Sequence, residues 1–211
     1  MRMFPRLLVC AALAAALAAA CTDPDAARAK KTTVPTYDKK TGKLTELTFD
    51  RNKNGVIDTW TEMDGKRPLR ARIDTDEDGV IDRWEYYDAQ GGLLKVGFSR
   101  KHDGRVDAWA FSAPDGQVAR VEYSSTGDDR RIDRREFYEG GTLVRAEEDS
   151  DGDGLIDTWQ TYSGGVLATA AVDENHDGKP DRRLSYAGGV LVLIESEPDA
   201  AGRYTKRVDV K

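Results

Sequence analysis

Short segments in which hydrophobic and polar residues alternate run along most of the chain. In one of them Leu94, Val96 and Phe98 alternate with Lys95 and Gly97. A period of two places successive side chains on opposite faces of an extended strand, so one face is apolar and the other is polar. The pattern therefore predicts β-strands that are each buried on one side.

Tight turns rich in glycine separate these segments. Examples occur at residues 64–66, 140–141, 164–165 and 188–189. Glycine readily adopts the positive φ that short hairpin turns require, so consecutive strands are expected to pair antiparallel. A parallel β-solenoid is the alternative fold, because the length of the repeating unit would also suit one coil of a solenoid.

The pattern recurs every 24 to 26 residues, and each repeat contains a loop, a strand, a tight turn and a second strand. A fixed period of this kind is the signature of a repeat architecture. We therefore expect an all-β fold, an antiparallel meander of about seven hairpin repeats of about 24 residues with the loops along one edge, curled or twisted. The loops, numbered 1 to 7, begin at Asp50, Asp74, Ser99, Ser125, Asp149, Asp173 and Glu197.

Loops 2 and 5 follow the nonapeptide pattern Asp-x-Asp-x-Asp-Gly-x-x-Asp, and loops 1 and 6 follow it with Asn in place of one or two aspartates. In loop 2 (74–82) this places oxygen ligands at positions 1, 3, 5 and 9, and Gly79 at position 6 permits the sharp turn. These are the first nine positions of a calcium-binding loop, in which the backbone carbonyl of position 7 is a further ligand. The nonapeptide offers the ion no nitrogen or sulfur ligand, which disfavours zinc and copper.

The loops differ in the charge that they offer to a cation. Loops 2 and 5 carry four carboxylates, loop 6 carries three and loop 1 carries two, so we expect Ca²⁺ at these four loops and the weakest binding at loop 1. Lys101 at position 3 of loop 3, Arg130 in place of the glycine of loop 4, and Ala201 and Thr205 in loop 7 predict that those loops are empty. The expected ligands are Asp74, Asp76, Asp78, Val80 and Asp82 in loop 2; Asp149, Asp151, Asp153, Leu155 and Asp157 in loop 5; Asp173, Asn175, Asp177, Lys179 and Asp181 in loop 6; and Asp50, Asn52, Asn54, Val56 and Asp58 in loop 1.

A helical EF-hand does not fit these loops, because it needs a bidentate Glu at position 12 and a helix on each side. The nonapeptide instead resembles the calcium loops between strands in integrin-type propellers. The segments 37–44 and 87–93, with a Tyr-Asp pair before Gly and Leu, resemble the hairpins of YD repeats. Residues 37–211 as a whole resemble bacterial lipoproteins with tandem calcium-loop repeats.

The N-terminus has the features of a secretory signal. Arg2 and Arg6 precede an apolar run that reaches residue 20 and ends in small residues directly before Cys21, which resembles a lipobox. The resemblance implies a signal peptide at 1–20, a lipidated Cys21, a flexible tether at 21–36 and a repeat domain at 37–211, on a protein anchored to the bacterial cell envelope, expected at the outer membrane. An ordinary secreted protein in which Cys21 is a free thiol is the alternative.

The charge and the remaining motifs narrow the function. The net charge is −6, and loss of Arg2 and Arg6 leaves 30 basic and 38 acidic residues, a net charge of −8, which disfavours nucleic acid as a partner. No nucleophile–base–acid set and no phosphate-binding glycine loop stands out, so we do not expect an enzyme. His102 and His176 stand at position 4 of loops 3 and 6, where the side chain points away from the ion, and we expect both to be solvated.

Four tryptophans, Trp60, Trp84, Trp109 and Trp159, each follow the position-9 Asp by two residues. We expect them to pack with the aliphatic residues of the return strands, whereas an exposed row would suit binding to sugar rings. The expected function is that of a lipid-anchored, calcium-binding structural or interaction protein of the cell envelope, with an envelope protein or a glycan as partner. The alternative is a carbohydrate-binding or accessory domain of a surface enzyme system.

Overall fold

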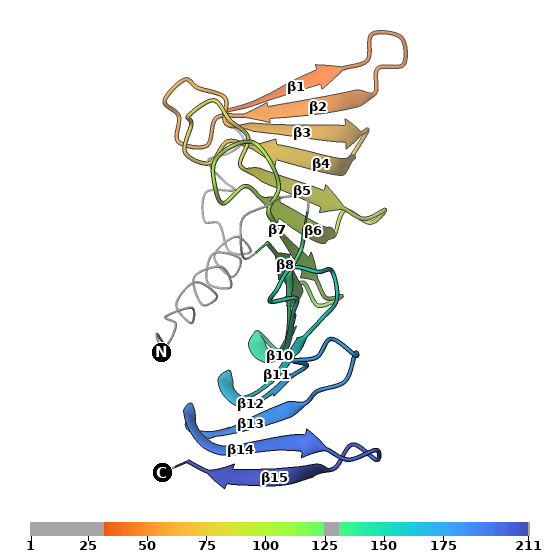
Figure 1. Ribbon diagram of the computed structural model, residues 1–211. Coiled ribbons are helices and arrows are strands. Elements are labelled where there is room, and N and C mark those ends of the chain that lie inside the picture. The colour runs from red at the N-terminus through yellow and green to blue at the C-terminus, as the bar shows by residue number, and fades with distance from the viewer. Residues whose placement is uncertain (1–31, 125–130, 211) are drawn as a thin grey trace. The chain divides into compact units, whose positions relative to one another are not determined.

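The computed structural model describes residues 32–124 and 131–210, and all regular elements in these ranges are β-strands (Figure 1). The strands are β1 (Thr33–Tyr37), β2 (Leu44–Phe49), β3 (Thr59–Asp64), β4 (Arg67–Ile73), β5 (Arg83–Tyr87), β6 (Leu93–Phe98), β7 (Ala108–Ser112), β8 (Val118–Tyr123), β9 (Arg134–Glu139), β10 (Thr142–Glu148), β11 (Thr158–Ser163), β12 (Val166–Val172), β13 (Arg182–Ala187), β14 (Val190–Pro198) and β15 (Tyr204–Asp209). No helix in the described part of the chain has the length and apolar character to span a bilayer.

The strands form an antiparallel meander in which each strand is hydrogen-bonded to its neighbours in the sequence. The predicted all-β meander of hairpins is confirmed, and the parallel solenoid is excluded. The chain divides into two compact units, residues 1–118 and 119–211. The first strand begins at Thr33, inside the segment expected to be a tether, because residues 33–36 pair with β2.

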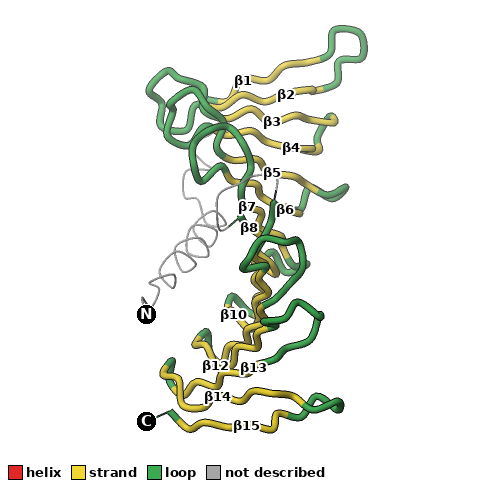
Figure 2. The backbone as a smooth tube through the Cα atoms, in the orientation of Figure 1, coloured by secondary structure: helices red, strands yellow, loops and turns green. Residues whose placement is uncertain are grey.

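Within each unit the two kinds of connection lie at opposite edges of the sheet, because successive connections of a meander alternate between its edges (Figure 2). The tight turns use glycine where it was expected: Gly140 and Gly141 between β9 and β10 have φ of 55° and 76°. Several hairpins also contain a register shift close to the turn, as between Glu62 and Met63. The nonapeptide loops consequently share one edge within a unit.

The buried face of the sheet is lined by small apolar side chains. In the first unit Ala71, Glu85, Val96 and Ala110 are successive cross-strand partners. Direct partners in an antiparallel pair lie on the same face, so they form one row. The buried hydrophobic residues are Ala71, Ile73, Val96, Ala108, Ala110, Val121, Ala146 and Ala170.

The tryptophans lie on the other face. Trp84 pairs with Arg72 on one side and with Gly97 on the other, and Gly97 pairs in turn with Trp109. The Lys95 Nζ lies 4.0 Å from the centroid of the Trp109 ring, a cation–π contact. The expectation that these rings pack with the return-strand aliphatics is therefore wrong, because Val96 faces the opposite side of the sheet from Gly97.

Charged side chains also enter the buried face of the second unit. Glu136 is 1% exposed, and it accepts hydrogen bonds from the Arg134 Nε at 2.9 Å and from the Tyr138 hydroxyl at 2.8 Å. A second carboxylate, that of Glu148, accepts from Arg134 Nη1 at 2.7 Å. In the first unit the equivalent Arg83 pairs with a carboxylate two residues later in the same way.

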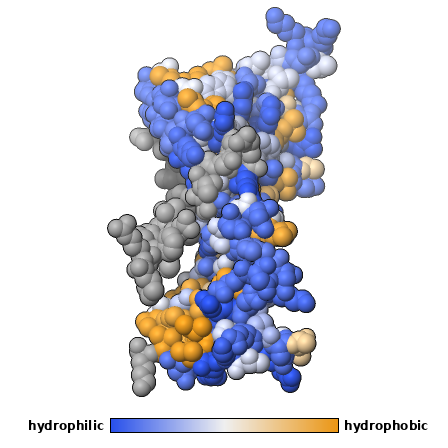
Figure 3. All heavy atoms as spheres, in the orientation of Figure 1, coloured by the Kyte–Doolittle hydropathy of each residue, from blue (hydrophilic) through white to orange (hydrophobic). Residues whose placement is uncertain are grey.

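The surface of the molecule is mostly hydrophilic on the side seen in Figure 3, with hydrophobic residues visible over both units and the largest group of them over the second. Exposed valines at its hairpin-turn edge include Val166 and Val190, which are 47% and 66% exposed. Val166 lies against the turn of the next hairpin, since a Cβ on Gly189 would be 3.7 Å from its Cγ1. Scattered exposed aliphatic residues are common on protein surfaces and do not by themselves define a binding site.

Candidate metal-binding loops

Each nonapeptide loop is folded by its own acidic side chains. In loop 2 the Asp74 Oδ2 accepts the backbone N–H of Gly79 at 2.9 Å, and Asp78 Oδ1 accepts that of Val80 at 2.8 Å. Gly79 has a φ of 92°, which a residue with a Cβ adopts only with strain. Loops 1, 5 and 6 repeat both hydrogen bonds. The sequence pattern thus encodes one loop conformation in all four places.

The position-9 carboxylate closes each loop. Asp82 accepts the backbone N–H of Thr75 at 3.0 Å, and Asp157 accepts that of Ser150 at 2.8 Å. Both aspartates are at most 5% exposed. Burial opposes ionisation of Asp157, but hydrogen bonds from the Ser150 and Thr158 hydroxyls outweigh it and lower its pKa. The site thus favours the charged form that a cation requires.

Acidic groups converge in loops 2 and 5. One carboxylate oxygen from each of Asp74, Asp76 and Asp78 lies within 4.8 Å of the others. Asp74 is 5% exposed, and its Oδ1 is buried with no hydrogen-bond partner in the described part of the chain. Loop 5 also brings three acidic side chains together, but its group includes position 9 in place of position 5, namely Asp149, Asp151 and Asp157. These clusters have the geometry to hold metal ions.

Loops 1 and 6 are less acidic at the same positions. In loop 6 the Asn175 Nδ2 donates to Asp181 Oδ1 at 3.0 Å, so one oxygen of the position-9 carboxylate already accepts a hydrogen bond from the position-3 amide. Among the described residues, groups of three acidic or histidine side chains form at loops 2 and 5 and at neither of these two loops. The expected position-7 residues Val56, Val80, Leu155 and Lys179 each donate a backbone N–H to the position-5 side chain.

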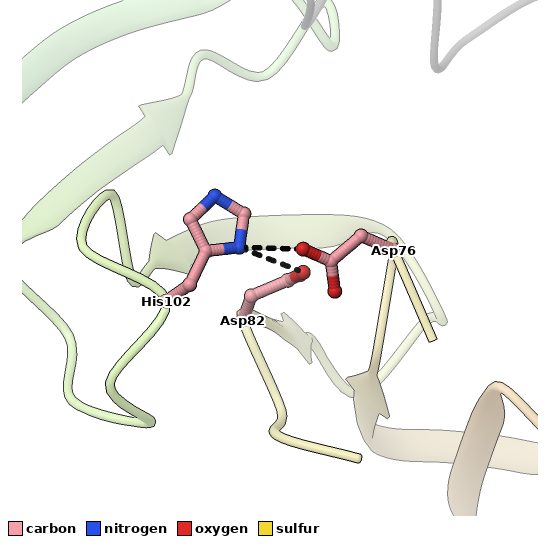
Figure 4. A group of neighbouring side chains, drawn as sticks. All are labelled: Asp76, Asp82 and His102. Atoms are coloured by element: carbon pink, nitrogen blue, oxygen red, sulfur yellow. Dashed lines mark ion pairs between the residues drawn. The ribbon is translucent and has the colours of Figure 1, made fainter. Parts of the chain in front are cut away.

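The side chain at position 4 contacts the loop of the preceding repeat. His102 of loop 3 places Nδ1 2.9 Å from the Asp76 Oδ2 and 3.9 Å from the Asp82 Oδ2 of loop 2 (Figure 4). His176 of loop 6 lies at loop 5, with Nε2 3.6 Å from the Asp151 Oδ2. Each ring therefore joins two successive loops of the same unit.

Both histidines are exposed to solvent, as expected, with side chains that are 52% and 42% exposed, but each also contacts the preceding loop. Their side chains point away from their own loop, as expected, and this direction leads them to the preceding loop. Position 4 has a positive φ, 54° at His102 and 60° at His176. Glu77 of loop 2 follows the same rule and accepts hydrogen bonds from the Asn52 and Asn54 amides of loop 1. The recurrence of position 4 across repeats was the sequence signal for this contact.

Cationic side chains pair with carboxylates of several loops, and in loops 3 and 5 they reach the carboxylates at the metal-ligand positions. Arg131 Nη2 lies 2.7 Å from the Asp149 Oδ2 and neutralises part of the charge of loop 5. In loop 3 the Arg100 Nε lies 3.1 Å from the Asp107 Oδ1, while Lys101 occupies position 3. Residues 125–130 of loop 4, including Arg130, and the predicted lipidation site Cys21 lie outside the described residues.

Comparison with known proteins does not assign the chain to a family. No family model matches it, and no curated protein matches it. Among solved structures, accessory secretory proteins 1, 2 and 3 of Streptococcus pneumoniae are 15% identical with a TM-score of 0.37, covering 51% of this chain and 19% of that one.

Two further structures are similar over part of the chain. TarM is 10% identical with a TM-score of 0.19, covering 62% of this chain and 20% of that one. The TcdB2–TccC3–Cdc42 structure is 13% identical with a TM-score of 0.23, covering 78% of this chain and 11% of that one. The chain thus spans a fifth or less of each of these proteins, and TM-scores this low do not define a shared fold.

Proposed function

We propose that this protein is a calcium-binding repeat protein without catalytic activity, in which cations at the loop edge stiffen each unit for a structural or interaction role. The observation that carries the proposal is the loop 2 cluster, where Asp74, Asp76 and Asp78 converge around a buried carboxylate oxygen without a partner. An unpaired buried carboxylate is costly unless a cation or a hydrogen-bond donor meets it. A bound cation would remove that cost.

The ligand chemistry supports calcium as the main ion. Ca²⁺ binds six to eight oxygen atoms from carboxylates, carbonyls and water in flexible geometry, which a loop of aspartates supplies. We expect dissociation constants of about 10⁻⁵ to 10⁻³ M, in the range of sensor and extracellular sites. Loop 2 is expected to bind more tightly than loop 5, because Arg131 already pairs with Asp149.

Calorimetric titration of the full chain with Ca²⁺ tests this proposal. Wild-type protein is expected to bind ions at loops 1, 2, 5 and 6. Asp76→Asn should abolish binding at loop 2 or weaken it about tenfold, since Asp76 belongs to its acidic group. Asp103→Asn in loop 3 is the control and should leave the binding unchanged. Absence of calcium uptake at millimolar concentration would contradict the proposal.

We also propose that Cys21 anchors the protein to the bacterial envelope, with the outer membrane as the expected location and an envelope protein or a glycan as the partner. Support comes from the lipobox-like sequence before Cys21. Acylation of both the thiol and the amine of this cysteine would supply the two or more chains that stable anchoring requires. Detergent-phase partitioning should be lost in Cys21→Ser and kept in Cys10→Ser. Equal partitioning of both variants would argue against the anchor.

Carbohydrate binding is the second candidate function, and the placement of the tryptophans favours it. Trp84 and Trp109 share one face of the sheet and are only partly buried. The Lys95 amine covers two of the aromatic rings, at 4.0 Å from Trp109 and 4.9 Å from Tyr86, and a sugar would have to displace it. Tryptophan fluorescence during a glycan titration distinguishes the two functions. A change in fluorescence would support glycan binding at the tryptophan face, whereas calcium binding at the loops alone predicts no change on addition of glycan.

A further inference from the structure

We propose that loops 2 and 5 are each completed by a histidine of the following loop, which forms a mixed nitrogen and oxygen site for a borderline divalent cation such as Zn²⁺. The inference rests on the proposed function, because it refines the ion preference of two of the same loops. It reverses the expectation from the isolated nonapeptide, which offers no nitrogen ligand.

The geometry of loop 2 carries the proposal. One ligand atom from each of Asp76, Asp82 and His102 lies within 4.8 Å of the others. Figure 4 shows the imidazole of His102 directed at both carboxylates, although the histidine comes from a different loop. Asp82 is 5% exposed and Asp76 is open to solvent, so the group lies at the surface with one buried wall.

An independent observation at the same loop points to a cation. Asp76 also belongs to the group with Asp74 and Asp78, so the histidine group and the acidic group are continuous. Only 5% of the surface of Asp74 is exposed, and its Oδ1 has no hydrogen-bond partner among the described residues. His102 satisfies Asp76 and lies near Asp82, whereas the Asp74 oxygen is left for an ion.

The second unit has a related group, in which the position-5 Asp153 takes the place of the position-9 aspartate. One ligand atom from each of Asp151, Asp153 and His176 lies within 4.8 Å of the others, and Asp151 is shared with the acidic group of Asp149 and Asp157. Position 3 therefore belongs to both groups in both loops. Because the chain contains only two histidines, their placement at equivalent positions makes a chance contact a poor explanation.

Imidazole changes the ion preference of these two loops. Zn²⁺ is bound in proteins by histidine nitrogen and carboxylate oxygen, usually by four ligands, whereas Ca²⁺ takes oxygen ligands in larger number. Loops 1 and 6 serve as internal references. At loop 1, position 4 of the following loop is Glu77, which contacts loop 1 through its carboxylate. At loop 6, position 4 of the following loop is Ala200, which has no ligand atom in its side chain. A pocket there is lined by residues of both loops, including Asp177, Asp181 and Ala200.

The test is titration of the full chain with Zn²⁺ alone, with Cys10 and Cys21 alkylated so that their thiols cannot bind the metal. Calorimetry gives the stoichiometry, and imidazole nitrogen resonances in NMR report on the two histidines alone. The variants are His102→Asn and His176→Asn, because asparagine tolerates the positive φ of position 4. Lys53→Asn is the matched control, since Lys53 is at position 4 of loop 1 with a φ of 63° and has no preceding nonapeptide loop.

Wild-type protein and Lys53→Asn are expected to bind two zinc ions with shifts of both imidazole signals. Each histidine variant should lose one site or at least tenfold in affinity there, and calcium uptake at loops 1 and 6 should persist. Unshifted imidazole signals, or unchanged zinc binding in the double variant, would overturn the inference and mean that the histidines only form ion pairs. Calcium titration of the same samples separates the two ideas: calcium uptake without zinc uptake overturns the inference alone, whereas absence of both overturns the proposed function as well.

Discussion

Single aspartates fix the turns at both edges of the sheet through hydrogen bonds to backbone N–H groups. Asp38, in the turn between β1 and β2, accepts from the Lys40 and Thr41 N–H groups at 3.0 and 2.7 Å and from the Thr41 hydroxyl at 2.8 Å. These bonds stabilise the carboxylate, and the side chain of Thr41 has the largest effect in lowering the pKa of Asp38. The same interaction shapes the nonapeptide loops.

We predict that Thr41→Val raises the pKa of Asp38 toward its ordinary value. A carboxyl whose pKa is lowered in the folded state contributes stability above its unfolded pKa, and that contribution is lost as the pH falls through the folded pKa. The variant should therefore lose the contribution at a higher pH than the wild type. The carboxyl carbon shift of Asp38, followed by NMR from pH 6 down to about pH 2 around the usual carboxyl pKa, measures it. Thr45→Val is the control and should leave the pKa of Asp38 unchanged, because the Thr45 hydroxyl donates to the backbone carbonyl of Thr36.

Local chemistry explains why the loops were predictable residue by residue. Gly79 at a φ of 92° and the bonds from Gly79 to Asp74 and from Val80 to Asp78 depend only on residues within the nonapeptide. The contact between His102 and Asp76 depends on the register between repeats, which one nonapeptide does not contain. The sequence pattern therefore predicted the acidic groups within loops 2 and 5 and missed the contact that the next loop supplies.

At the scale of the strand, the alternation predicted the hairpins and the buried face of the return strands, where Ala71 and Val96 are 2% and 0% exposed, but it did not predict the faces of the outgoing strands. In β5, Arg83 and Glu85 lie on one face and Trp84 on the other, so large or charged side chains occur on both. The cross-strand partners determine which face of β5 is buried, since Glu85 lies between Ala71 and Val96 in the buried row. Hydrophobicity alone would have buried the tryptophan and exposed the ion pair.

The buried ion pair in β9 is expected to contribute strongly to the stability of the second unit. Burial opposes the charge of Arg134, but Tyr123 and Glu136 outweigh it and raise the pKa of this guanidinium, so Arg134 is charged. We predict that Arg134→Ala lowers the free energy of unfolding by about 3–5 kcal/mol, because the buried Glu136 loses the guanidinium that balances its charge, while it keeps the neutral hydroxyls of Tyr123 and Tyr138 as donors. Urea denaturation of the full chain measures the change.

Arg145→Ala is the control for this prediction. Arg145 pairs with Glu147 on β10, but its side chain is 46% exposed. Exposed ion pairs contribute at most about 1 kcal/mol, so the loss should be correspondingly small. Similar losses for the two variants would show that Glu136 finds other donors, and the buried pair would then have no special part in the stability of the sheet.

At the scale of the whole molecule, the loops concentrate negative charge at one edge within each unit, on a chain of net charge −6. Carboxylates that lie within 4.8 Å of one another repel, and the small apolar residues of the buried face provide limited compensation. Each repeat of a repeat protein contacts mainly its neighbours, so strain at one loop reaches the adjoining hairpins. Cation binding is therefore expected to stabilise several hairpins at once.

We predict that chelation of calcium lowers the melting temperature, and that Asp153→Ala lowers it in calcium while Asp103→Ala has little effect. Both residues stand at position 5 and accept the backbone N–H of position 7, at 2.7 and 3.0 Å, so each substitution removes the same turn hydrogen bond. They differ in surroundings, because Asp153 lies in a group with Asp151 and His176, whereas Lys101 occupies position 3 of loop 3. Asp103 also accepts a hydrogen bond from the Ser99 hydroxyl at 3.1 Å, so the effect of each variant in calcium is compared with its effect in chelator, and the part that disappears in chelator reports on the ion.

The expected difference in melting temperature follows from the free energy by which a bound ion stabilises the folded state. An ion that binds only the folded state contributes about 2.7 kcal/mol per site at a hundredfold excess over Kd. A domain of 60–100 residues changes its melting temperature by roughly 4–8 °C per kcal/mol, so at that excess of calcium loss of loop 5 should lower the transition of the second unit by roughly 10–20 °C. In chelator both variants should melt close to the chelated wild type. Equal shifts of the two variants in calcium and in chelator would mean that the aspartates act only as turn residues, and calcium binding would then have no part in holding the repeats together.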